Sequence, residues 1–278
     1  MNVCFVILNY HDEKRVINLS KKIVSFSFKP IVFIVNNNED KSNSLFDSLK
    51  EFKNIKLMEP VGNIGYPNGY NIAFRFILSQ GNFDYIFSIN SDVDFSEFVS
   101  LKCIDMLELN DKIGLISPRM ITLGKEEPAY WSFPTYEDLL KLNFGFYKKS
   151  KTSDYKFQND NSEYKIVDVI RASFFCIRNK ALKDVGGYSN ETFLYNNENI
   201  LAKKLLDFGY KSAILTNCFY YHNHVNGDNN YKRLKIGYRD NKIYMKNYLH
   251  SNFFQIQFYS LSFWIMYFPI SIKKFFFH

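Results

Sequence analysis

The sequence has few cysteines, and none of them forms a C-x-x-C pair. The four thiols are scattered along the chain, at Cys4, Cys103, Cys176 and Cys218. Structural zinc sites and disulfide frameworks need several cysteines at short, regular spacings, so this pattern argues against both kinds of site. Scattered cysteines are typical of a reducing compartment, which favours the cytosol.

The sequence also shows no secretory signal peptide and no internal repeat. Its first apolar run, residues 3–8, is too short for a signal peptide and lacks a basic leader and a cleavage site. This run is better explained as the first β-strand of a folded domain.

What the chain does contain is a large apolar and aromatic fraction and an excess of basic residues. Of its 278 residues, 46% are apolar and 18% aromatic, and the formal net charge is +7. This composition excludes a disordered chain, and the length fits one large α/β domain or two smaller domains. The positive charge predicts an anionic partner, which could be nucleic acid, an anionic membrane or a phosphorylated substrate. Because the sequence contains no nucleic-acid-binding motif, we expect no nucleic acid.

Apolar runs and segments with helical spacing alternate over the first 90 residues. The expected strands are residues 3–8, 31–35, 55–58 and 85–89, and the expected helices are residues 12–26, 44–52 and 70–79. This alternation predicts an α/β fold with a mostly parallel sheet and helices on both faces. Residues 122–163 are only weakly periodic and are expected to form an excursion over the sheet. Helices at 179–185 and 196–208 and short strands at 213–215 and 219–221 follow.

Polar clusters stand where three of the expected strands end. They are Asn9-Tyr10-His11, Asn36-Asn37-Asn38 and Asn90-Ser91-Asp92. Ligands of parallel α/β sheets bind at the carboxyl ends of the strands, so these clusters are candidate binding residues. Ordinary polar turns are the alternative, but turns alone would contain more glycine and proline.

The segment from Asn90 to Asp94 is a candidate metal site. Alternate residues of an extended chain project to one side, so Asp92 could share a divalent ion with Asp94 or with Asn90. Oxygen ligands suit Mg²⁺ or Mn²⁺, and either ion could hold a diphosphate. Alternatively, Asp94 or Ser96 caps the N-terminus of the next helix.

The loop from Asn63 to Asn71 precedes an expected helix and contains Gly65 and Gly69. Glycines let the backbone approach a ligand closely, and a helix N-terminus favours anions. The loop matches neither the P-loop nor the G-x-G-x-x-G pattern, and an ordinary connecting loop is the alternative.

Two further segments carry candidate chemistry. Glu198 falls in the first turn of a predicted helix, where it could act as a general base or merely complement the helix dipole. His222 and His224 follow a short strand two residues apart, so both imidazoles could ligate a metal or contact phosphate. Polar surface is the alternative for the two histidines.

The C-terminal region combines a basic stretch with a long uncharged one. No charged residue occurs in residues 251–272, and aromatic side chains are frequent there. Upstream lie the cations Lys232, Arg233, Lys235, Arg239, Lys242 and Lys246. We expect the segment to lie on an anionic membrane surface, with packing on the domain or in a homodimer, or a true membrane span, as alternatives.

Taken together, eight segments in this order resemble glycosyltransferase family 2, the inverting enzymes of GT-A fold. The resemblance is greatest to bacterial members that build O-antigen, capsule and other surface polysaccharides. The segments are VCFVILNY, IVFIVNNN, NIGYPNGYN, YIFSINSDVDF, GLISPRM, FFCIRNKALKDVGGY, TFLYNNENILAKKLLDFGYK and FYYHNH. They indicate a GT-A domain over residues 1–225 and a basic and hydrophobic helical region over residues 226–278.

The resemblance also implies roles for individual residues. Glu198 stands where the family keeps its base, and Asp92 stands at the position of the DXD metal ligand. The nucleotide-sugar-binding residues would be Asn9, Asn36, Asn37, Asn63, Gly65, Gly69, Asn90 and Ser91. The ligands of a divalent cation, Mn²⁺ or Mg²⁺, would be Asp92, Asp94, His222 and His224.

The function implied is transfer of a sugar from a nucleotide-diphosphate donor to a glycan or lipid-linked glycan acceptor. UDP-hexose is the expected donor and dTDP-rhamnose the alternative. The enzyme would be peripheral on the inner face of the cell membrane. Asn36, Asn197 and Ser189 stand where the family usually has acidic residues, which could mean an altered donor or lost activity. A catalytically inactive nucleotide-sugar-binding protein is therefore one alternative. A nucleotidyltransferase is another, since sheets of this kind also bind nucleotides through acidic pairs.

Overall fold

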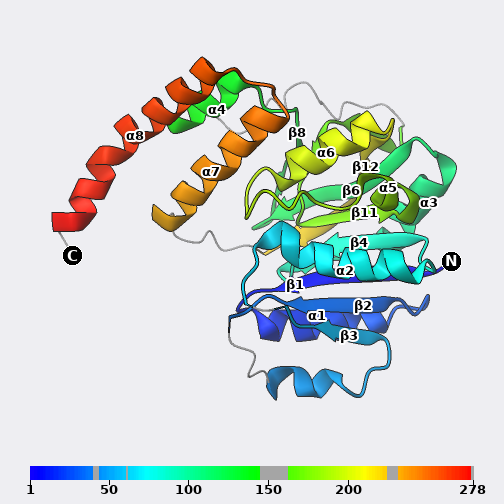
Figure 1. Cartoon of the computed structure of the whole chain (residues 1–278). Coiled ribbons are helices and arrows are strands. Elements are labelled where there is room, and N and C mark those ends of the chain that lie inside the picture. The colour runs from blue at the N-terminus through cyan, green and yellow to red at the C-terminus, as the bar shows by residue number, and fades with distance from the viewer. Residues whose placement is uncertain (40–43, 61, 145–161, 224–230, 277–278) are drawn as a thin grey trace.

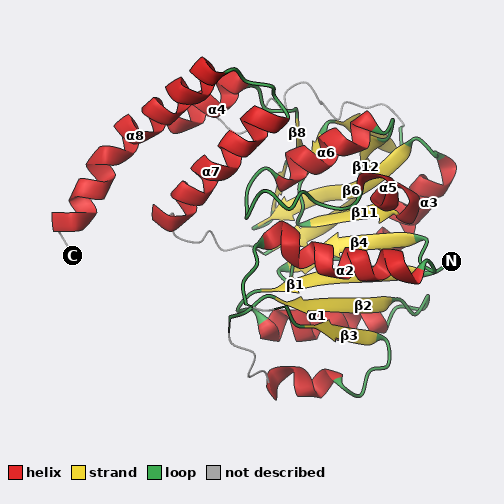
Figure 2. Cartoon of the chain, in the orientation of Figure 1, coloured by secondary structure: helices red, strands yellow, loops and turns green. Residues whose placement is uncertain are grey.

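One large twisted sheet organises the chain, as Figure 1 and Figure 2 show, and β8 and β10 form a separate two-stranded sheet. The computed structural model describes residues 1–39, 44–60, 62–144, 162–223 and 231–276. Within them the main sheet has ten strands, with the order β3-β2-β1-β4-β11-β6-β12-β5, while β7 pairs with β6 and β9 with β12. Strands β3, β2, β1 and β4 run parallel, and β12 is parallel to β6. The expected mostly parallel α/β sheet is therefore confirmed.

The elements have the following bounds. The strands are β1 (Val3–Asn9), β2 (Ile31–Asn36), β3 (Ile55–Met58), β4 (Tyr85–Ile89), β5 (Val93–Asp94), β6 (Ile113–Thr122), β7 (Lys125–Glu127), β8 (Tyr130–Trp131), β9 (Tyr164–Val167), β10 (Val169–Ile170), β11 (Phe174–Arg178) and β12 (Lys211–His222). The helices are α1 (Glu13–Val24), the 3₁₀ helix η1 (Ser44–Leu49), α2 (Tyr66–Gln80), α3 (Glu97–Leu109), α4 (Tyr136–Asn143), α5 (Asn179–Val185), α6 (Asn197–Asp207), α7 (Tyr231–Asn247) and α8 (Phe253–Phe276).

Helices cover both faces of the sheet because its central strands are apolar on both sides. One apolar cluster joins the sheet to α1 and α3, through residues such as Val16 and Cys103. A second cluster joins the other face to α2, α5 and α6, through residues such as Phe74 and Leu205. All four cysteines are free and buried in these layers or beside them.

Three elements differ from their expected form. Helix α2 begins at Tyr66, four residues before the expected start, because Pro67 fits the first turn of a helix. The two short strands expected at 213–215 and 219–221 form one strand, β12, whose pairing with β6 shifts register between Ile214 and Phe219. The expected excursion at 122–163 contains β7, β8 and α4 in the part that the structure describes.

The C-terminal region forms a pair of helices, α7 and α8, that lies beside the sheet with α4 (Figure 1). A third apolar cluster holds it in place: Leu139 of α4, Ile200 of α6, Tyr244 and Met245 of α7, and Tyr259 of α8. The expected boundary between residues 225 and 226 lies outside the described residues.

Candidate active site

The asparagines at the ends of β1 and β2 are buried and hydrogen-bonded to one another. Asn9 Nδ2 donates to Asn36 Oδ1 at 2.9 Å, and both side chains are almost fully buried. Asn37 Nδ2 donates to Asn63 Oδ1 at 3.1 Å, and Asn37 Oδ1 accepts from the N–H of Ile64 at 3.1 Å. The structure thus brings Asn9, Asn36, Asn37 and Asn63 together at one edge of the sheet.

The two glycines of the 63–71 loop lie at close contacts within the protein. A Cβ atom on Gly65, whose φ is +87°, would lie 2.7 Å from the carbonyl oxygen of Phe193. A Cβ atom on Gly69 would lie 2.5 Å from a methyl carbon of Leu8. The backbone conformation and the Phe193 carbonyl therefore require a glycine at 65, whereas a side chain at 69 would displace the Leu8 methyl group; contact of either glycine with a nucleotide stays a prediction.

The side chains of the two residues after β4 bond to two different neighbours. Ser91 Oγ donates to Asp12 Oδ2 at 2.6 Å, and Asn90 Oδ1 accepts from the Tyr66 hydroxyl at 3.1 Å. The hydroxyl of Tyr66 is buried, which is the main cause of its raised pKa, and the negative charge of Glu198 contributes to that rise. The Tyr66 hydroxyl therefore bonds to the strand end at Asn90 and is near enough to Glu198 for that carboxylate to act on its pKa.

Asp92 and His222 form a pair. Asp92 Oδ1 lies 3.2 Å from His222 Nε2, and their side chains are only 10% and 8% exposed. The antiparallel pairing of β5 with the end of β12 brings them together, and the N–H of Asn223 donates to the Asp92 carbonyl at 2.9 Å.

Asp94 is separate from this pair, contrary to the expectation that it could share an ion with Asp92. Its carboxylate bonds to Lys22 of α1 and is more than half exposed. Asp94 pairs in register with Tyr221, one position before His222, and its side chain bonds to Lys22 of α1. His224, the fourth metal candidate, lies outside the described residues. Among the residues that the structure describes, no three acidic, histidine or cysteine side chains gather at one metal position.

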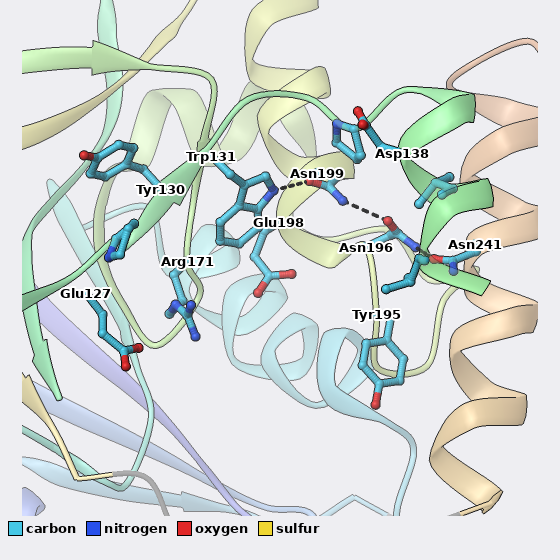
Figure 3. Close-up of a pocket in the computed structure, with 14 residues that line it drawn as sticks. Glu127, Tyr130, Trp131, Asp138, Arg171, Tyr195, Asn196, Glu198, Asn199 and Asn241 are labelled. Carbon is cyan, nitrogen blue, oxygen red and sulfur yellow. Dashed lines mark hydrogen bonds between the residues drawn. The ribbon is translucent and has the colours of Figure 1, made fainter. Parts of the chain in front are cut away.

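Glu198 lies in the first turn of α6 and lines a cavity of about 530 Å³ (Figure 3). The cavity is lined from β7, β8, α4, α6 and α7, and its aromatic residues are Tyr130, Trp131 and Tyr195. Burial raises the pKa of the Glu198 carboxyl, while backbone hydrogen bonds and the positive charge of Arg171 act in the opposite direction. A carboxylate with a raised pKa that faces a cavity can accept a proton from a bound hydroxyl.

Arg171 is the cation among the described residues that line this cavity, and sequence reasoning missed it. It follows β10 directly, and its backbone N–H donates to the Ala129 carbonyl at 2.8 Å. Figure 3 shows its guanidinium in the same cavity as the Glu198 carboxylate. No sequence motif singled it out, because its partners come from distant parts of the chain.

A chain of hydrogen bonds connects the cavity to the C-terminal helices. Trp131 Nε1 donates to Asn199 Oδ1 at 2.8 Å, and Asn199 Nδ2 donates to Asn196 Oδ1 at 2.8 Å (Figure 3). Asn196 Nδ2 then donates to Asn241 Oδ1 at 2.7 Å, and Asn241 Nδ2 donates to the Tyr259 hydroxyl at 2.8 Å. This chain runs through β8, the start of α6, α7 and α8.

Asp240 of α7 holds the loop that leads to Glu198. Its fully buried carboxylate accepts from the consecutive backbone N–H groups of Phe193, Leu194 and Tyr195, at 2.9 to 3.2 Å. Arg239 Nη2 lies 3.3 Å from the same carboxylate. Asp240 is the one acidic residue of the basic stretch 231–247, and this isolation is the sequence feature that could have drawn attention to it.

Asn197, one of the departures from the family pattern, has a local structural role. Its Oδ1 accepts from the Thr192 hydroxyl at 2.6 Å, and its Nδ2 donates to the Leu194 carbonyl at 2.8 Å. The buried Asn197 side chain therefore closes the 192–197 turn and leaves Glu198 as the carboxylate at this end of the cavity.

Comparison with known proteins gives similarities to glycosyltransferases. No protein-family model matches the chain. The chain is 24% identical over 199 residues to the low-salt glycan biosynthesis hexosyltransferase Agl10 of Haloferax volcanii, and the match covers 72% of this chain. It spans 59% of the length of that relative.

Solved structures of glycosyltransferases have the same fold. GalNAc-T7 with UDP, GalNAc and Mn²⁺ superposes with a TM-score of 0.60 at 12% identity, over 81% of this chain and 44% of the other. A mannosyltransferase of Pyrobaculum calidifontis in complex with GDP-Man and Mn²⁺ superposes with a TM-score of 0.60 at 10% identity, over 90% of this chain and 65% of the other. TarS of S. aureus superposes with a TM-score of 0.54 at 14% identity, over 89% of this chain and 40% of the other. The expected GT-A fold is therefore confirmed.

Proposed function

We propose that this chain is an inverting glycosyltransferase that moves a hexose from a nucleotide-diphosphate donor to a hydroxyl of a glycan or lipid-linked glycan. The observation that carries the proposal is Glu198, a carboxylate with a raised pKa in a 530 Å³ cavity of a GT-A fold. The names of the relatives support it, since one is a hexosyltransferase and two contain a nucleotide or nucleotide sugar with Mn²⁺. UDP-hexose is the first donor to test and dTDP-rhamnose the second.

In the proposed reaction, Glu198 accepts the proton of the acceptor hydroxyl as its oxygen attacks the anomeric carbon. The bond from that carbon to the diphosphate oxygen breaks in the same step, so the configuration inverts and the nucleoside diphosphate leaves. The aromatic walls at Trp131 and Tyr130 would position the acceptor and exclude water. Arg171 balances part of the Glu198 charge, which keeps the carboxylate available as a base.

Asp92 and His222 are the residues that would hold a divalent cation. A carboxylate oxygen and an imidazole nitrogen 3.2 Å apart, both nearly buried, fit two positions of a Mn²⁺ coordination sphere. A bound cation would supply positive charge that stabilises the leaving diphosphate.

The asparagine cluster would bind the nucleotide. Asn9, Asn36, Asn37 and Asn63 lie at the carboxyl edge of the parallel strands, which is where α/β sheets bind their ligands. Asn90 and Ser91 lie at the end of the neighbouring strand β4. Asn36 stands where the resembling family usually has an acidic residue, which would alter the contact with the nucleotide. The choice of nucleotide therefore needs a direct test.

We also propose that the protein is peripheral on the inner face of the membrane, where a lipid-linked glycan would be within reach. No helix in the part of the chain that the structure describes is long and apolar enough to cross a bilayer. A capsule, O-antigen or other surface polysaccharide would be the product of this chemistry.

The first experiment is a thermal-shift screen with UDP-, GDP- and dTDP-sugars, each with Mn²⁺ and with EDTA. A nucleotide at about 100 times its Kd stabilises the folded state by about 2.7 kcal/mol. We expect a shift that depends on Mn²⁺ for one nucleotide class. No shift with any nucleotide would contradict the proposed donor site.

The second experiment tests the base with Glu198→Gln, and Glu127→Gln, another carboxyl of the cavity, is the control. We expect Glu198→Gln to lower kcat about a hundredfold or more while the donor still binds. An active Glu198→Gln variant would contradict the role of this residue. Donor binding without turnover in the unmodified protein would identify an inactive nucleotide-sugar-binding protein.

A further inference from the structure

Helix α8 has two faces of different environment. Tyr259, Ser262 and Phe263 are buried on the inner face, which packs on α4 and α7. Asn143 of α4 fixes this face, since its Nδ2 donates to Ser262 Oγ at 2.9 Å. The orientation of α8 on the body of the protein is therefore defined, and its opposite face points away from that body.

The outer face of α8 is apolar and exposed. Its large apolar side chains are Phe253, Phe254, Phe258, Leu261, Trp264 and Ile265. Phe254 is 80% exposed and Phe253 68% exposed. Exposed apolar side chains are normal when they are scattered, whereas a row along one helix marks an interaction surface.

Cations of α7 lie beside this apolar face. A groove of about 430 Å³ between α7 and α8 is lined by Arg239, Lys242 and Lys246 together with Ile256 of α8. Further along α7, Lys232, Arg233 and Lys235 are exposed. Glu191 is the acidic residue among those that line this groove.

We propose that the outer face of α8 and the α7 cations together form a docking surface for an anionic lipid bilayer. This inference rests on the peripheral membrane location proposed above and names the surface that would produce it. Phenylalanine and leucine would enter the boundary between headgroups and acyl chains, and Trp264 suits the same depth. The cations would contact anionic headgroups.

Charge decides between a bilayer and a second copy of this chain. A symmetric pair of copies joined through α8 would bring two sets of α7 cations near each other, which is unfavourable. An anionic bilayer would neutralise the same cations, so the charge beside the apolar face favours lipid.

The test is co-sedimentation of the full chain with vesicles of phosphatidylcholine alone or mixed with phosphatidylglycerol. We expect the protein to pellet with the anionic vesicles, less so as salt increases, and not with the neutral ones. Lys242→Glu with Lys246→Glu should weaken this binding about tenfold or more, because each reversal replaces attraction by repulsion. Phe254→Ser with Phe258→Ser should abolish it.

Two matched variants control for charge and for apolarity. Lys53→Glu with Lys56→Glu makes the same charge change near β3, at the opposite edge of the sheet (Figure 1). Leu109→Ser with Leu123→Ser removes two exposed apolar side chains elsewhere. Both control variants should bind anionic vesicles as the unmodified protein does.

Failure of the unmodified protein to pellet with anionic vesicles, or equal loss in the control variants, would overturn the proposal. So would light scattering that shows a dimer which dissociates on Phe254→Ser with Phe258→Ser. The nucleotide thermal shift is measured on the same variants and does not depend on lipid. A lost thermal shift with intact vesicle binding would contradict the transferase proposal alone, and the reverse result would contradict the docking surface alone.

Discussion

At the scale of single residues, the environment of Glu198, the proposed base, predicts that both activity and stability depend on pH. Burial holds the pKa of its carboxyl above the usual range for glutamate. As a base it must be ionised, so we expect kcat/KM to fall on the acid side with an apparent pKa above that of an ordinary glutamate. A pH–rate profile measures this directly.

The same shift predicts how stability changes with pH. Because the folded-state pKa is raised, Glu198 contributes most to stability below the pKa of the unfolded chain, and this contribution is lost as pH rises through the folded pKa. Relative to the unmodified protein, Glu198→Gln should therefore gain thermal stability as pH rises from about 4 to about 8. Thermal melts of both proteins over this pH range measure the difference in Tm, with Glu127→Gln as the control variant. A difference in Tm that is constant with pH would contradict the raised pKa.

Asp92 and Asp94 provide a second prediction at this scale, because the structure gives them different partners. Asp92 contacts His222, whereas Asp94 bonds to Lys22. We expect Asp92→Asn to weaken Mn²⁺-dependent nucleotide binding about tenfold or more, and Asp94→Asn to leave it unchanged. Calorimetric titration with and without Mn²⁺ measures both. Equal weakening by the two variants would show that the ion is held differently from the proposed arrangement.

At the scale of elements, helix α7 and the turn before α6 are joined through Asp240. Three consecutive backbone N–H groups donate to its carboxylate, and Asp240→Asn replaces one of the two acceptor oxygens by an NH₂ group, which donates and cannot accept. We expect a loss of about 2 kcal/mol in the free energy of unfolding. We also expect a lower kcat with unchanged donor affinity, because the turn positions Glu198.

Asp184→Asn is the matched control, since Asp184 forms a surface pair with Lys180 on α5. If Asp240→Asn lowered stability while kcat at a permissive temperature stayed normal, Asp240 would be a structural residue without a positioning role. Asp240→Glu, which keeps the charge, should restore part of the rate.

The same scale shows what the sequence could predict. The strands ending at Asn9, Asn36 and Ile89 were predictable, because buried parallel strands are continuous apolar runs with polar ends. The sequence marked Asp92 and His222 as metal candidates in two separate motifs, but neither motif alone predicted that the two side chains pair. The lone acidic residue of the basic stretch 231–247 marked Asp240 as unusual, but neither its role nor that of Arg171 could be predicted, since both roles come from packing between segments that lie far apart in sequence.

At the scale of the whole molecule, the apolar cluster around Tyr244 and Tyr259 ties the C-terminal helices to the sheet domain. We therefore expect residues 231–276 to unfold together with the sheet in one cooperative transition. The two tryptophans report on the two parts, because Trp131 lines the cavity and Trp264 lies on α8. Fluorescence melts of Trp131→Phe and Trp264→Phe should coincide with each other and with circular dichroism. An earlier transition for Trp264 alone would show that the C-terminal helices form a separate unit.

The four buried cysteines have a practical consequence for studying this molecule. Burial raises the pKa of all four thiols, so we expect the folded chain to react slowly with thiol reagents. A cysteine introduced at an exposed position, such as Leu261→Cys on α8, would then carry a spin label or fluorophore without removal of any native thiol. The depth of this probe in a bilayer could be compared with the depth of a second probe at Leu123→Cys. The difference between the two depths would give the orientation of the whole protein on the membrane.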